Sequence, residues 1–310
     1  MADEELNISY AELETEVVSR KNVVNQAILN KRNELKEKLP VKSELIENSF
    51  SSLTFVNGDT LREYRLAFIK DGKDFPKEIN LTDGMVIFLM LSNTLNNLDR
   101  KVEKLTAMNV KEKPSGKALG EVMSSGRSGI KKSGERISHI EMLDDIGSLA
   151  MALNLDTSQW KDLFNEILRQ QERGMTMVKK YTENNKVYSL EEALEYRLGT
   201  VGNYYYLLAT CLPSELKSEF LTEVGLEQLF DDIGDVSEDE VNQVNPFVAL
   251  LKKYGILDKY KAGKTNIIDT KIVGDEDRVS YSNDLDLIYS SYGKIKRNIP
   301  FIVRTKDGKE

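Results

Sequence analysis

The sequence predicts an almost entirely α-helical protein that folds as a single domain over residues 1–310, and three observations predict it. Proline is scarce, with 6 residues in 310, and long segments lack both proline and glycine. Apolar residues recur at helical spacing in most of these segments, whereas few runs alternate as a half-buried strand does. One segment follows the i, i+3, i+4, i+7, i+8 pattern of an amphipathic helix: Trp160, Leu163, Phe164, Ile167 and Leu168. An apolar content of 40% is enough for a large core.

Three stretches flank or interrupt the predicted bundle. Residues 1–45 are expected to form a charged helical extension that ends near Pro40, because proline interrupts helices. Residues 115–135, rich in Gly, Ser, Lys and Arg, are expected to form a flexible basic loop. Its first interpretation is a solvated linker between two helices, and the alternative is a mobile lid over an anionic ligand. Residues 305–310 form a polar tail.

Local sequence signals predict two inner helices. The run from Met85 to Leu91 is the most apolar, but a bilayer span needs about 20 apolar residues, so we expect a buried core helix. Ser189, followed three residues later by Glu192, has the spacing of a capping box and predicts a helix start.

The acidic start of the chain lacks the basic-then-apolar pattern of a signal peptide. We therefore expect a cytoplasmic protein, and peripheral contact with a membrane stays open.

Composition excludes several classes of function. The net charge of −8 makes the chain a poor ligand for nucleic acid, because neutralising phosphates requires clustered Lys and Arg. The only cysteine, Cys211, precludes an internal disulfide, and the only histidine, His139, argues against a zinc site or a His-based triad. We expect Cys211 to be a buried apolar side chain and His139 to lie at the surface or at a helix cap.

The strongest local signal is an acidic run from Asp231 to Glu240 that directly follows an apolar helical segment. On a helix Asp231 and Asp235 share one face, as do Asp232, Asp235 and Asp239, and like charges stacked in this way repel unless a cation neutralises them. Carboxylates suit hard cations such as Mg²⁺, which bridges to phosphate. The alternative is a solvated acidic helix end. The apolar lead-in and Gly234, which lets a helix or a ligand approach closely, favour the metal; the glycine position excludes an EF-hand.

A second segment contains two glycines in a helical context, Gly199 and Gly202. Each costs about 1 kcal/mol relative to alanine in a helix interior, which indicates a packing or functional reason. Because they lie three residues apart, they share one face and leave a groove there. One interpretation is close packing between helices, and the other is a helix thinned to admit a ligand.

The order and spacing of these segments resemble the squalene/phytoene synthase family of head-to-head prenyl synthases. The stretch from Gly199 to Gly202 (GTVG) is similar to its A-G-T-V-G motif, with Leu198 in place of the alanine. The stretch from Gln228 to Asp235 resembles the second aspartate-rich motif of the family, and the 29 residues from Gly202 to Asp231 are about the gap that the family uses. Further similarities lie in the same order as in the family: Gly174 to Val178, Tyr181, Leu190 to Glu192, Tyr289, Tyr292 and Ile299-Pro300. The resemblance covers roughly residues 75–300.

The first aspartate motif of the family, D-x-x-x-D, has an incomplete counterpart here. It would follow the apolar run from Met85 to Leu91, where the candidates are Asn96 with Asp99 and Arg100, or Asp99 with Glu103. Val178 also stands where the family has an aspartate. A motif with fewer carboxylates would bind fewer or weaker metal ions.

The resemblance implies an orthogonal helical bundle of the class I isoprenoid synthase type around a central cavity. It implies Mg²⁺ as cofactor and allylic prenyl diphosphates as ligands; NADPH is compatible with it, but no motif indicates it. The catalytic and metal-binding aspartates would be Asp231, Asp232 and Asp235, with Asp239, Asp99 and Glu103 as further metal ligands. The expected substrate-binding residues are Asn96, Tyr196, Arg197, Gly199, Thr200, Gly202 and Tyr205.

Two rival hypotheses remain at this stage. The first keeps the fold and changes the reaction to terpene cyclisation or head-to-tail elongation, which cavity shape decides. The second is a non-catalytic helical protein, either a prenyl-lipid carrier or an interaction module derived from the enzyme fold. The incomplete first motif and Val178 favour the second.

Overall fold

The computed structural model describes residues 10–54, 56–69, 74–111, 129–130, 136–184, 188–242, 244–263 and 266–297. Over these residues the secondary structure is helical, apart from one antiparallel pair of two-residue strands, so the all-α prediction is confirmed. Contacts divide the chain into unit 1 (residues 1–94 and 127–155) and unit 2 (residues 95–126 and 156–310). The single-domain and orthogonal-bundle predictions stay predictions.

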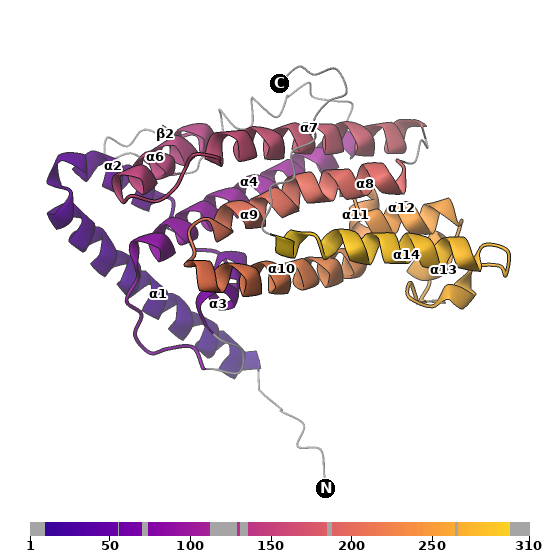
Figure 1. Ribbon diagram of the computed structural model, residues 1–310, viewed down its shortest axis with the longest axis horizontal. Helices are drawn as coiled ribbons and strands as arrows, with labels where there is room; N and C mark the ends of the chain where they lie inside the picture. The colour runs from indigo at the N-terminus through magenta and orange to yellow at the C-terminus, as the bar shows by residue number, and fades with distance from the viewer. Residues whose placement is uncertain are drawn as a thin grey trace, which may run out of the picture. The chain divides into compact units, whose positions relative to one another are not determined.

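Unit 1 is built on helices from the first half of the chain (Figure 1). They are α1 (Tyr10–Lys38), η1 (Pro40–Lys42), α2 (Ser43–Ser51), α3 (Gly58–Phe68), the start of α4 (Asp83–Lys111) and α6 (His139–Ala152). The short strands β1 (Gly129–Ile130) and β2 (Arg136–Ile137) pair with each other. Helix α1 ends just before Pro40, where the sequence predicted it. The rest of the predicted loop 115–135, and the tail 305–310, lie outside the described residues.

The start of α4 forms the core of unit 1. All six side chains from Val86 to Leu91 have 0% exposure, which confirms the predicted buried helix. The buried polar side chain of Asn93 follows this run; its Nδ2 donates to the Ser52 carbonyl at 2.7 Å, and its Oδ1 accepts from the Asn57 backbone N–H at 3.1 Å. These bonds join α4 to the end of α2 and the start of α3. His139 is the first residue of α6 and is fully buried, so the surface alternative was wrong; it lies directly beside the helix cap, which is Ser138.

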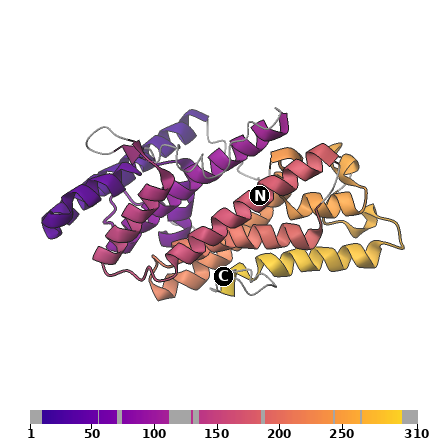
Figure 2. The same cartoon turned by 90° about the horizontal axis from the view of Figure 1, so that it is seen from above.

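Unit 2 holds the second part of α4 and the helices after residue 156. These helices are α7 (Trp160–Asn184), α8 (Leu190–Arg197), η2 (Leu198–Gly202), α9 (Asn203–Ala209), α10 (Ser214–Gly234), α11 (Val236–Asn242), α12 (Pro246–Lys253), α13 (Leu257–Lys261), η3 (Thr270–Ile272), α14 (Arg278–Tyr292) and η4 (Ile295–Arg297). In Figures 1 and 2, α7, α8 and α14 run alongside one another, and η2 packs on α7 while α10 packs on α9, α14 and η4.

Two local predictions in unit 2 are confirmed, one for a helix cap and one for the cysteine. Ser189 caps α8 in a capping box with Glu192, as the sequence predicted. Cys211 is buried, also as predicted. Among the described helices, none combines the length and the apolar character that crossing a membrane requires.

Candidate functional site

The segment from α8 to α9 supplies the inner wall of the candidate site. Helix α8 ends at Arg197 and continues without a break through η2, a single π-helical turn, into α9. Such π-turns occur frequently at functional sites. The Thr200 hydroxyl donates to the Tyr196 carbonyl at 3.0 Å, and the Asn203 side-chain amide donates to the Gly199 carbonyl at 3.0 Å. Buried polar side chains thus satisfy the carbonyls of the irregular turn.

The glycines of this region allow α7 to approach η2 and α8 closely. A Cβ at Gly199 would lie 2.6 Å from the side chain of Gln170, and one at Gly174 would lie 2.3 Å from the ring of Tyr196. Both contacts are too short for real carbon atoms, so these positions require glycine for packing. The packing interpretation therefore explains Gly199, while the substrate-binding roles of Gly199 and Gly202 stay predictions.

A buried ion pair connects the end of α8 to the end of α10. The Arg197 Nε donates to both carboxylate oxygens of Asp232, at 3.0 and 2.9 Å, and its Nη2 contacts Oδ1. Gln228 Nε2 donates to Asp232 Oδ1 at 2.9 Å, and the Tyr292 hydroxyl donates to Oδ2. Asp232 has 0% exposure. Burial disfavours the charged guanidinium, but the Asp232 carboxylate holds the pKa of Arg197 well above its ordinary value.

This ion pair changes what two predicted site residues can do. The sequence analysis assigned Asp232 to the metal and Arg197 to the diphosphate, yet the two side chains bind each other. The acceptor positions of Asp232 are occupied by Arg197, Gln228 and Tyr292. Either predicted role therefore requires this pair to separate first.

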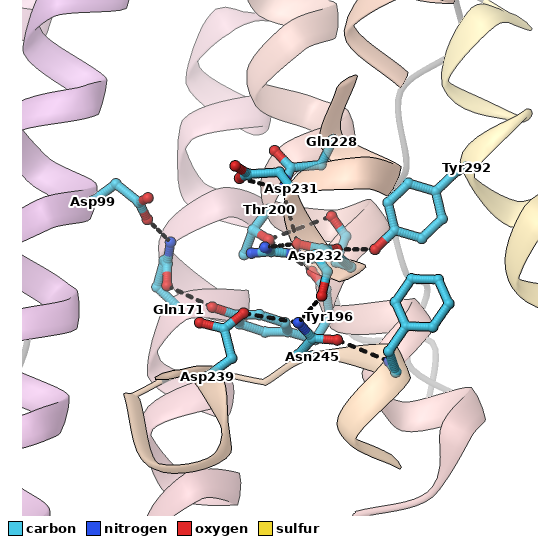
Figure 3. A network of polar contacts seen from close by, with 12 residues as sticks. Asp99, Gln171, Tyr196, Thr200, Gln228, Asp231, Asp232, Asp239, Asn245 and Tyr292 are labelled. Carbon is cyan, nitrogen blue, oxygen red and sulfur yellow. Dashed lines mark hydrogen bonds and ion pairs between the residues drawn. The ribbon is translucent and has the colours of Figure 1, made fainter. Parts of the chain in front are cut away.

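Asp239 is likewise held inside the fold. Asn245 Nδ2 donates to Asp239 Oδ2 at 2.9 Å and to the Asp232 carbonyl at 2.7 Å. Asn245 Oδ1 accepts from the Phe247 backbone N–H at 2.8 Å and so caps α12. Asp239 is 3% exposed. The Asn245 amide thus links the end of α10, the middle of α11 and the start of α12 (Figure 3).

Asp231 and Asp235 are the more accessible acids of the cluster. Asp231 is exposed near the end of α10 and accepts a long hydrogen bond of 3.3 Å from Gln228. Asp235 is half-buried just after α10; burial raises the pKa of Asp235, and the charges of Asp231, Glu238 and Asp232 add to the increase. In the part of the chain that the structure describes, neither Asp231 nor Asp235 forms an ion pair with Lys or Arg.

Gly234 lies in open space at the end of α10. It is exposed, and a Cβ built on it would meet no atom within 4 Å. No described helix lies within contact distance of this position, so the expected close approach by a helix is wrong, and the approach of a ligand stays a prediction.

The second part of α4 brings the first-motif candidates to the same unit. Asp99 Oδ1 accepts from Gln171 Nε2 of α7 at 2.9 Å, and Asn96 Oδ1 accepts from the Tyr204 hydroxyl of α9 at 3.1 Å. Figure 3 shows Asp99 entering the polar network from α4, with the Asp231 carboxylate on the side nearer α4 and Tyr292 on the far side. The side chain of Glu103 lies outside the described residues.

The aromatic side chains near the glycines form core contacts. Tyr196 is 2% exposed and Tyr205 is 4% exposed. The ring of Tyr205 packs edge-on against Tyr204 and Phe220. A cavity of about 270 Å³ lies between the start of α8 and the end of α12, and none of the predicted site residues lines it. The expected central cavity therefore stays a prediction.

The structure joins most of the predicted residues and adds others that sequence reasoning missed. The network contains Asp99, Tyr196, Arg197, Thr200, Asp231, Asp232 and Asp239. Gln171 and Asn245 were not singled out. The Asn245-Pro246 pair has the sequence of a helix start, with a capping residue before proline, and could have been found. No sequence signal marks Gln171, because its role depends on which helices face α7.

Within the described residues, no group of three or more His, Cys, Asp or Glu side chains gathers closely enough to hold a metal ion. No protein-family model, no curated protein and no solved structure matches the chain.

Proposed function

We propose that unit 2 forms the active site of a Mg²⁺-dependent prenyl-diphosphate synthase that joins two prenyl diphosphates head-to-head. The main support is the position of Asp235, a half-buried carboxylate beside Asp231 with no ion-pair partner among the described lysines and arginines. Burial and the neighbouring negative charges raise the pKa of Asp235 although the charge of Arg197 lowers it, and a divalent cation would offset the repulsion between the carboxylates. The resemblance supplies the reaction and the substrates.

The residues present would fit an Mg²⁺ ion that is bound through two carboxylates, water and substrate phosphates. Mg²⁺ keeps several waters and is usually bound through one or two carboxylates together with substrate phosphates. Asp231 and Asp235 would supply those carboxylates, whereas Asp99 on α4 does not gather with them closely enough to hold the same ion. Asp232 and Asp239 are engaged by Arg197 and Asn245. Bound Mg²⁺ would neutralise the charge of the departing diphosphate.

Aromatic side chains of the protein would exclude water from the reactive carbon of the substrate. Tyr196 and Tyr205 are almost fully buried, and aromatic faces attract cations. Exclusion of water would protect the carbocation that forms when the allylic C–O bond breaks. Arg197 would reach the diphosphate only by exchanging Asp232 for it, so binding would open the ion pair.

Incubation of the purified chain with farnesyl or geranylgeranyl diphosphate and Mg²⁺ tests the proposal. We expect diphosphate release that depends on Mg²⁺, and a condensed hydrocarbon with twice the carbon number of the substrate. A cyclised or an elongated head-to-tail product would instead favour one of the related reactions on the same fold. The absence of diphosphate release with every allylic diphosphate tried, together with unchanged thermal stability, would overturn the proposal.

One observation favours a second candidate, a non-catalytic protein that binds prenyl lipids or other proteins. Arg197 and Asp232 satisfy each other inside the fold, as a purely structural pair would. A thermal melt with Mg²⁺ and an unreactive prenyl diphosphate analogue separates the two candidates. An enzyme should gain about 2.7 kcal/mol of stability at 100 times the dissociation constant of the analogue. A prenyl alcohol that stabilises the protein equally well without Mg²⁺ would favour the carrier.

A further inference from the structure

A cavity of about 270 Å³ in unit 2 lies outside the polar network described above. It is partly open to solvent, between the start of α8 and the end of α12, and none of its described lining residues belongs to that network. Sites for small molecules usually have volumes of about 300 to 1,000 Å³. The cavity therefore fits a ligand near the small end of that range.

Three lining residues form an apolar floor. Tyr188, Leu190 and Ala249 are 6%, 4% and 2% exposed. The Tyr188 ring is held in place, because its hydroxyl accepts from the Asn245 backbone N–H at 3.3 Å and the ring packs edge-on against that of Tyr181. A ligand that covers this apolar floor with its own apolar atoms removes both surfaces from water, which favours binding.

Two adjacent lysines of α12 bring positive charge to the same cavity. Lys252 Nζ pairs with Glu240 Oε1 at 2.8 Å and lies 5.0 Å from the centroid of the Tyr181 ring. Lys253 Nζ pairs with Asp284 Oδ2 at 2.6 Å. An ammonium has three N–H donors, so each lysine keeps a donor for a ligand beyond these contacts. The same contacts hold the two flexible side chains, which lowers the entropy cost of binding.

The start of α8 adds backbone donors, since Ser189, Leu190 and Glu191 also line the cavity. The first four N–H groups of a helix have no carbonyl partner within it. The capping box satisfies two of them, because the Ser189 N–H donates to Glu192 at 2.8 Å and the Glu192 N–H donates to Ser189 at 3.1 Å. The N–H groups of Leu190 and Glu191 remain for a ligand, at the positive end of the helix dipole. Glu191 is exposed, so its carboxylate can extend into water.

We propose that this cavity binds a phosphate monoester that carries a small apolar group. The apolar group lies on the apolar floor, and the phosphate oxygens accept from Lys252, Lys253 and the start of α8. Lysine ammonium groups and helix starts both bind phosphate in proteins, the first through charge and the second through backbone N–H groups. The inference is independent of the proposed function, because neither a metal ion nor a residue of the polar network takes part.

Isothermal titration calorimetry of the full chain with phenyl phosphate tests the proposal, in a buffer with EDTA so that no metal site contributes. We expect saturable binding of one molecule per chain. Inorganic phosphate lacks the ring and benzyl alcohol lacks the phosphate, so each should bind at least about tenfold more weakly. Lys253→Gln removes a charged donor and should weaken the binding of phenyl phosphate about tenfold. Ala249→Val adds methyl groups to the apolar floor without changing any charge; it should also weaken binding, and it serves if Lys253→Gln does not fold.

Lys259→Gln provides a matched control. It removes the same charge from an exposed position on α13 that does not line the cavity, so the affinity for phenyl phosphate should stay unchanged. Equal weakening by Lys253→Gln and Lys259→Gln would show non-specific attraction of anions and would overturn the proposal. A wild type without saturable binding would overturn it as well. Benzoate that binds as tightly as phenyl phosphate would overturn the assignment to a phosphate.

Discussion

Arg197 and Asp232 form a fully buried ion pair that fixes the end of α8 to the end of α10. The two residues are 35 positions apart in sequence, and the hydroxyl of Tyr292 from α14 donates to the same carboxylate. Burial of a charge is costly unless the partner is well placed. The stability of unit 2 therefore depends on the presence of both side chains.

The first prediction concerns the loss of one partner of this pair. Asp232→Ala leaves the Arg197 charge buried without its carboxylate, and we expect a loss of about 3 to 5 kcal/mol in unfolding free energy. Urea denaturation followed by circular dichroism measures it. Asp231→Ala, one residue earlier but exposed, should change stability by less than about 0.5 kcal/mol. Similar losses for the two variants would contradict the buried pair.

The second prediction concerns Asp235 without and with metal. Because the folded state raises the pKa of Asp235, its charged form destabilises the fold at neutral pH, and stability should increase as pH falls through the raised pKa. Asp235→Asn should therefore be neutral or slightly stabilising in the absence of metal. With Mg²⁺ and a diphosphate analogue it should lose most of the ligand-induced increase in melting temperature. A variant that keeps the full increase would show that Asp235 is not a ligand, and Glu215→Gln, at the other end of α10, is the control.

The third prediction concerns acid sensitivity at Glu240. Burial alone would raise the pKa of Glu240, but hydrogen bonds from Lys252, Lys261 and Tyr181 lower it to about 2 from an ordinary value of 4.5. A depressed carboxyl pKa stabilises the fold above the unfolded value, and this contribution disappears as pH falls from about 4.5 toward 2. Glu240→Gln should be less stable than the wild type at neutral pH, and the difference should shrink across this window. Urea midpoints measured from pH 7 to pH 2 test this, and a constant difference would contradict it.

The fourth prediction concerns the contact between α7 and α8. Gly174→Ala would place a Cβ 2.3 Å from the Tyr196 ring, so α8 must shift, and we expect a loss of about 1 to 3 kcal/mol. Gly234→Ala meets no atom within 4 Å and should be neutral or stabilising by up to about 1 kcal/mol through helix propensity. Thermal melts of the two variants in parallel test the packing. A neutral Gly174→Ala variant would show that the ring is not pressed against α7.

The helical class and several helix ends could be predicted from the sequence because they depend on nearby residues. The apolar run from Met85 to Leu91 and the capping box at Ser189 act within a few residues of each other, and both predictions are confirmed. The sequence also singled out two segments that the structure brings together, since Asp231, Asp232 and Asp239 of the acidic run and Thr200 of η2 lie in one polar network (Figure 3).

Only the tertiary structure decided what each of those residues does. Asp231 and Asp232 are adjacent and chemically identical, yet one is exposed while the other is fully buried against Arg197. A helix rotates by about 100° per residue, so neighbours face different surroundings. Which surroundings they meet depends on how α8, α10 and α14 pack. For the same reason the hydrogen bonds of Gln171 to Asp99 and Tyr196 could not be predicted, because a hydrogen bond between distant segments leaves no local pattern in the sequence.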